Sequence, residues 1–84
     1  MDSASIRTIY FRSFVRLCQI FSEGGDDAFE PWSPYAEEIR DMGWRLHEEG
    51  GRGLMDAVFH LFNYGEERKT AVARLEWRWD GIGV

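Results

Sequence analysis

The sequence predicts an all-α fold: a compact antiparallel bundle of four helices that forms one domain over residues 1–84. Apolar side chains recur at helical spacing along four segments of the chain. Glycine pairs at 24–25 and 50–51 separate the first three of these segments. Because the connections are short, consecutive helices are expected to lie side by side in opposite directions. With 84 residues and 15% aromatic residues, the chain has enough apolar surface for one core.

The first predicted helix covers residues 3–22 and is expected to be the central member of the bundle. Its apolar side chains are Ile6, Ile9, Tyr10, Phe11, Phe14, Val15, Leu17, Cys18, Ile20 and Phe21. They cover well over half of the helix circumference, which is typical of a helix surrounded by others. We therefore expect Ile9, Leu17 and Ile20 deep in the core. The same β-branched and aromatic content also suits strands, which is the alternative for this segment.

The second and third predicted helices cover residues 33–49 and 53–63, with a glycine-rich connection between them. Ser33-Pro34 is a typical helix start, because proline is tolerated in the first turn. The second helix has a narrow apolar stripe, formed by Tyr35, Ile39, Met42 and Leu46. The third helix is apolar nearly all round. Gly43 lies inside the second helix and lowers its stability, so we expect a neighbour to approach closely there.

The fourth predicted helix covers residues 66–80. It begins with acidic residues and gathers basic residues later, which suits the helix dipole. Its core stripe is Ala71, Val72, Leu75 and Trp79. Gly81 is expected to end the helix in the left-handed conformation, and Ile82 to turn back toward Trp79 or the first predicted helix.

Two tryptophans lie away from the apolar stripes of their helices. Trp77 is about 160° from the stripe of the fourth helix, and Trp44 about 170° from that of the second. Tryptophan and arginine are enriched at the centres of protein interfaces. We therefore expect a Trp/Arg patch formed by Trp44, Trp77, Arg40 and Arg74, which binds a protein partner or a second copy to form a homodimer. The alternative is that each tryptophan covers side chains on the protein's own surface.

Composition narrows the class of protein. The net charge is −5, and residues 23–49 carry nine acidic residues against two arginines, which argues against nucleic-acid binding. A single cysteine, Cys18, excludes an internal disulfide. The sequence has no apolar run long enough to span a membrane, so we expect a cytoplasmic protein. The composition of residues 1–22 also fits an organelle transit peptide, which is the alternative for that segment.

Chemical motifs are sparse. Asp56 and His60 are four residues apart on one predicted helix, so the carboxylate can orient the imidazole for acid–base work. A cleft holding both with a third polar group would favour an enzyme. A second alternative is a DNA-binding helix-turn-helix of residues 53–63 and 66–80, although Glu66 and Glu67 lie where base-reading residues belong. No ligand spacing for a metal and no phosphate-loop motif is found, so no metal, cofactor or small molecule is predicted.

Two stretches, EEGGRGLMDAV and LEWRWDGIGV, resemble short uncharacterised bacterial proteins whose tails read Trp-Asp-Gly-Ile-Gly. The resemblance covers about the last half of the chain and implies no activity and no functional residues. Many such chains continue with another tryptophan, whereas this one ends at Val84. A small regulator from a mobile element that docks on a host protein would belong to the same binding class.

Overall fold

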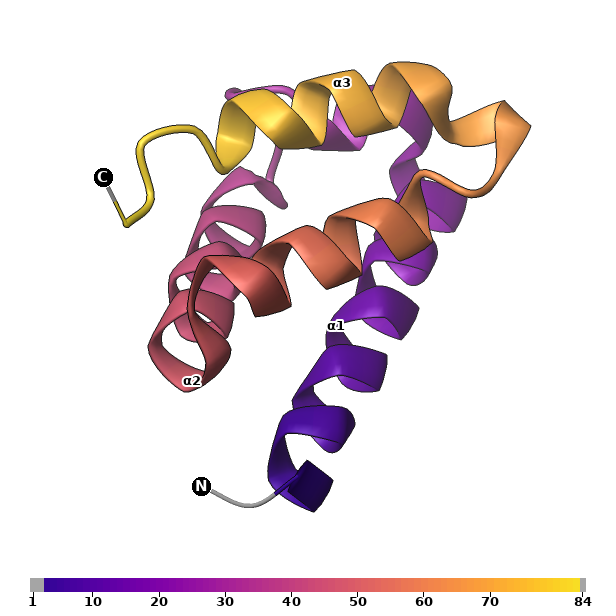
Figure 1. Cartoon of the computed structure of the whole chain (residues 1–84). Helices are drawn as coiled ribbons and strands as arrows, with labels where there is room; N and C mark the ends of the chain where they lie inside the picture. Colours follow the sequence, from indigo (N-terminus) through magenta and orange to yellow (C-terminus); the bar gives the residue numbers. More distant parts are fainter. Residues whose placement is uncertain (1–2, 84) are drawn as a thin grey trace.

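The computed structural model describes residues 3–83, which form three α-helices and two 3-10 helices (Figure 1). In chain order they are α1 (Ser3–Gly24), η1 (Gly25–Phe29), α2 (Ala36–Phe62), η2 (Glu66–Arg68) and α3 (Lys69–Arg78). The all-α class is therefore confirmed. The radius of gyration is 11.9 Å, close to the value of about 12 Å expected for a compact chain of this length.

The prediction of four helices is wrong, because the predicted helices 33–49 and 53–63 belong to one bent helix, α2. The bend is at Gly51, whose backbone angles are φ 71° and ψ −167°. Only glycine adopts this region without strain, so the chain changes direction there. Figure 1 shows the second arm of α2, residues 52–62, turning away from the first arm, residues 36–50. Glycine-rich sequence predicts a break in helical geometry but does not distinguish a bend from a loop.

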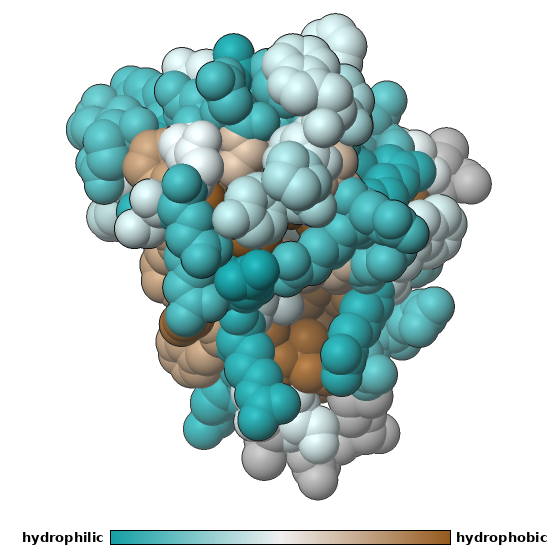
Figure 2. All heavy atoms as spheres, turned by 180° about the vertical axis from the view of Figure 1, so that it is seen from behind, coloured by the Kyte–Doolittle hydropathy of each residue, from teal (hydrophilic) through white to brown (hydrophobic). Residues whose placement is uncertain are grey.

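The prediction that the first helix is central is also wrong. Leu17 and Ile20 are fully buried, as expected, but Ile9 is only half-buried. Phe11 and Val15 are 52% and 50% exposed. α1 packs against α2 and η1, and Figure 1 shows its N-terminal end extending beyond the other helices. A three-helix arrangement has too few neighbours to cover so wide an apolar arc. Figure 2 shows the molecule from behind, where apolar surface lies open between polar side chains.

The core lies where α1, η1, α2 and α3 meet. The largest fully buried side chains are Phe29, Phe62, Leu17, Ile20, Ile39, Leu46, Met55, Leu75, Ile82 and Val58. The rings of Phe29 and Phe62 lie 5.5 Å apart, centre to centre. Phe29 belongs to η1, so a short 3-10 helix between two α-helices contributes a central side chain.

The C-terminal segment folds back as predicted. Gly81 has a φ of +84°, and Ile82 is fully buried. Trp79 is 5% exposed, and its indole Nε1 donates a hydrogen bond of 2.8 Å to the carbonyl oxygen of Ile39. A Cβ atom on Gly43 would lie only 2.6 Å from the Trp79 ring. The close approach expected at Gly43 is therefore confirmed, and the approaching group is the end of α3 with the turn that follows it.

Candidate binding surfaces

Trp77 and Trp79 face opposite sides of α3. Trp77 is 74% exposed, whereas Trp79 lies in the core. Trp77 borders a hollow of about 260 Å³ between η1 and α3. The residues that line this hollow are Phe29, Glu30, Ala73, Arg74, Trp77 and Arg78. We call it the Trp77 hollow. Another protein chain could pack against the exposed indole and also fill the hollow beside it.

Trp44 lies in different surroundings. It is 42% exposed, and its ring makes an edge contact with the His47 ring at 6.4 Å, centre to centre. The adjacent residue, Gly43, faces the core beside Trp79. Among the contacts described for residues 3–83, none joins Trp44 to Trp77. The contacts described for this part of the chain therefore do not join the predicted patch into one cluster. The patch comprises Trp44, Trp77, Arg40 and Arg74.

Arg40 is engaged inside the molecule. Its Nη1 donates hydrogen bonds of 2.6 Å to the carbonyl oxygens of Arg78 and Asp80. Carbonyl groups at the C-terminal end of a helix lack partners within the helix. A cation placed there takes this role by donating hydrogen bonds to them, and it stabilises the helix by interacting with the negative end of its dipole. Arg40 therefore fastens the end of α3 to the first arm of α2.

Arg74 is engaged as well. Its Nε pairs with Glu30 at 2.5 Å, and its Nη1 pairs with Asp27 at 3.3 Å. These ion pairs tie α3 to η1 and to the residue that follows η1. The charge of Arg74 is therefore largely neutralised next to Trp77. Sequence reasoning missed this role because its acidic partners are more than forty positions away along the chain.

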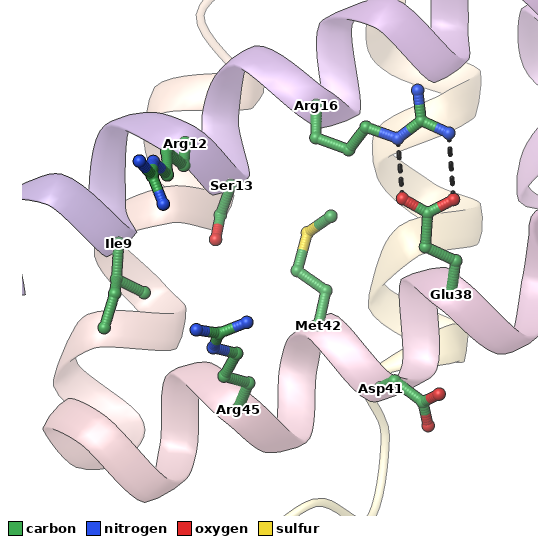
Figure 3. Close-up of a pocket in the computed structure, with 8 residues that line it drawn as sticks. All are labelled: Ile9, Arg12, Ser13, Arg16, Glu38, Asp41, Met42 and Arg45. Carbon is green, nitrogen blue, oxygen red and sulfur yellow. Dashed lines mark hydrogen bonds and ion pairs between the residues drawn. The ribbon is translucent and has the colours of Figure 1, made fainter.

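The structure also contains a hollow that sequence reasoning missed. It lies between α1 and the first arm of α2, has a volume of about 310 Å³, and is shown in Figure 3. Its lining residues are Ile9, Arg12, Ser13, Arg16, Glu38, Asp41, Met42 and Arg45. We call it the arginine hollow. Polar and apolar side chains of two separate helices form it, so only the packing of these helices in three dimensions reveals it.

Arg16 and Glu38 form a bidentate ion pair at one end of the arginine hollow. The Arg16 Nε lies 2.6 Å from the Glu38 Oε2, and the Arg16 Nη2 lies 2.9 Å from the Glu38 Oε1. This hydrogen bonding is the main reason that the pKa of Glu38 is lowered and the pKa of Arg16 is raised. The pair stabilises the contact between α1 and α2.

Asp56 and His60 border a third hollow, of about 220 Å³, between α2 and α3. Its lining residues are Arg52, Met55, Asp56, Phe59, His60, Glu76, Trp79 and Asp80. The condition set for an enzyme, a cleft with a third polar group, is thus met by Glu76. However, Asp56 pairs with Arg52 at 3.5 Å, and no hydroxyl or thiol group is among these lining residues. The hollow therefore supplies no hydroxyl or thiol nucleophile, and we assign it no function.

Three of the four basic residues that a helix-turn-helix would present, Arg68, Lys69 and Arg74, make internal contacts; the fourth is Arg78. Arg68 Nε donates a hydrogen bond of 2.8 Å to the carbonyl oxygen of Phe62, and its guanidinium stacks over the Phe62 ring at 4.9 Å. Lys69 pairs with Glu66 at 3.2 Å, and Arg74 holds η1. Phosphate contacts need free cations, so this arrangement weakens the DNA-binding alternative.

Searches for relatives return no family model, no curated protein and no solved structure that matches this chain. Between residues 3 and 83, no group of three or more metal-binding side chains is found. Within the same range, every helix is too short or too polar to cross a membrane. The functional argument therefore rests on the surfaces themselves.

Proposed function

We propose that the protein acts by binding another protein chain, with Trp77 as the central anchor of the contact. The exposure of Trp77 is the observation that supports this, because a large indole that is 74% exposed contributes nothing to the core of its own chain. Buried at an interface, it would remove a large apolar area from water. A second copy of the chain is the simplest partner.

The neighbourhood of Trp77 suits an anchor. The two ion pairs of Arg74 hold α3 against η1, so the surface around the indole is fixed before binding. Fixed surfaces lose less conformational entropy on association. Arg40 and Arg74, predicted as contact residues, are proposed to act as supports of this surface. Trp44, which is partly exposed on α2, is proposed as a separate second contact.

Self-association is tested by sedimentation over a range of concentrations. We expect the native chain to dimerise and Trp77→Ala to weaken the dimer by about tenfold or more, since hot-spot tryptophans contribute at least about 2 kcal/mol. Trp32→Ala is the matched control, because Trp32 is 75% exposed and lies outside the Trp77 hollow. Equal weakening by both variants would remove Trp77 from the centre of the contact.

If the native chain stays monomeric at all concentrations, the partner is a different protein. Affinity capture from the native cell then uses the same pair of variants. A partner retained by Trp32→Ala and lost by Trp77→Ala supports the proposal. A partner held equally by both variants contradicts it. Both variants should unfold like the native protein, with changes in stability below about 1 kcal/mol, so that folding does not explain the loss.

A further inference from the structure

We propose that the arginine hollow binds a small phosphate monoester. This site is independent of the proposed protein contact, because the arginine hollow and the Trp77 hollow share no lining residue. The proposal also departs from the sequence-based expectation of no small-molecule partner. Arg12 and Arg45 belong to different helices, and the sequence alone does not show that they line one hollow.

Two cations of the hollow are free to bind a ligand. Among the residues that the structure describes, neither Arg12 nor Arg45 has a hydrogen-bond or ion-pair partner. In Figure 3, the guanidinium of Arg45 points from α2 toward α1, and the hydroxyl of Ser13 points from α1 toward α2. Ser13 is only 8% exposed. Arg45 and Ser13 therefore face the space between the two helices, and Arg12 lines the same hollow.

In the described part of the chain, the acidic residues of the lining form no ion pair with Arg12 or Arg45. Glu38 is paired with Arg16, and Figure 3 shows the carboxylate of Asp41 directed away from α1. The whole chain carries a net charge of −5, which repels anions in general. Attraction for an anion here must therefore come from the local convergence of the arginines.

A phosphate group matches this set of donors. A phosphate ester carries a charge of about −1.5 to −2 near neutral pH, which balances Arg12 and Arg45 together. A carboxylate, with a single charge, would leave one cation unpaired. Each guanidinium presents a planar fork of N–H groups suited to two phosphate oxygens, and the Ser13 hydroxyl adds a further donor.

The size and the remaining walls indicate a small ester. The volume of about 310 Å³ is at the lower end of the range of about 300–1,000 Å³ for small-molecule sites. Ile9 and Met42 supply apolar wall. An organic group attached to the phosphate would contact these two side chains, which inorganic phosphate alone cannot do.

The test is a calorimetric titration of the full chain with phenyl phosphate at low ionic strength. We expect saturable binding with one site per chain, and we expect Arg12→Gln and Arg45→Gln each to weaken it by about tenfold. Arg7→Gln is the matched control, because it removes the same charge from an exposed position of α1 outside the hollow. The affinity of the Arg7→Gln variant for phenyl phosphate should equal that of the native protein. Equal weakening by all three variants, or no saturable binding, would overturn the proposal.

Two further measurements define the ligand. Inorganic phosphate should bind more weakly than phenyl phosphate, because it lacks the part that contacts Ile9 and Met42. Equal affinity would overturn the assignment to an ester. Glu38→Gln releases Arg16 from its ion pair and should tighten phenyl phosphate binding severalfold by adding a third free cation. Unchanged or weaker binding in this variant would overturn the placement of the phosphate among the arginines.

Discussion

At the scale of single residues, the arginines divide into those that hold the fold and those that remain free. Arg40 binds carbonyl oxygens at the end of α3, and Arg74 binds two carboxylates beside η1. Arg12 and Arg45 have no such partners among the described residues. All four lie in predicted helices, so their roles depend on which distant groups the fold brings within reach.

The ion pair between Arg16 and Glu38 predicts a pH-dependent contribution to stability. Because the hydrogen bond lowers the pKa of Glu38 in the folded state, the contribution is complete above the ordinary carboxyl pKa of about 4.3 and is lost as the pH falls through the lowered value. Both side chains are partly exposed, at 35% and 43%, so Glu38→Gln should cost no more than about 1 kcal/mol at pH 7.

Urea unfolding at several pH values checks this expectation. The stability difference between the native chain and Glu38→Gln should shrink toward zero below about pH 4. Glu37→Gln is the control, since Glu37 is exposed in the same helical turn and has no ion-pair partner in the described part of the chain. A cost of Glu38→Gln that is the same at pH 7 and pH 3 would show that the ion pair is not its source.

At the scale of elements, the bend in α2 determines where the two arms lie. We expect Gly51→Ala to destabilise the protein by about 1–3 kcal/mol, because its backbone angles are strained for any residue with a Cβ atom. Space is not the cause, since a Cβ there would meet nothing within 4 Å. Gly53→Ala is the control and should be neutral or stabilising by up to about 1 kcal/mol. Thermal unfolding of both variants measures these stability changes. Equal changes in Gly51→Ala and Gly53→Ala would contradict the role of Gly51.

Local signals predicted some elements well. The helical bounds of α1 and the burial of Trp79 follow from side-chain spacing, and the turn that buries Ile82 follows from Gly81. The position of Phe29 in the core did not follow, because one buried residue in a short 3-10 helix has no periodicity to detect. The arginine hollow was also beyond prediction, since it depends on the rotation of α1 relative to α2.

At the scale of the whole molecule, a single core joins all the α-helices and η1. A domain of this size has a total stability of about 5–15 kcal/mol. We expect Leu17→Ala to cost about 2–5 kcal/mol, because Leu17 is fully buried in that core. Loss of this much should shift the unfolding of every element together in one cooperative transition.

Circular dichroism in the far and near ultraviolet checks this cooperativity. Val15→Ala is the matched control, since Val15 is 50% exposed on the same helix and should change stability by no more than about 0.5 kcal/mol. Separate transitions for helix content and for aromatic packing would contradict a single core. So would a melting temperature of Leu17→Ala equal to that of the native protein.

The separation of the tryptophans into one buried ring and three exposed rings gives the molecule two optical signals. Trp79, shielded and hydrogen-bonded to Ile39, should emit at shorter wavelength and resist quenching by acrylamide. Trp32, Trp44 and Trp77 are in contact with water and are open to the quencher. A partner that covers Trp77 would therefore reduce the quenchable fraction while the signal of Trp79 stays constant. Fluorescence thus distinguishes association from unfolding without any attached label.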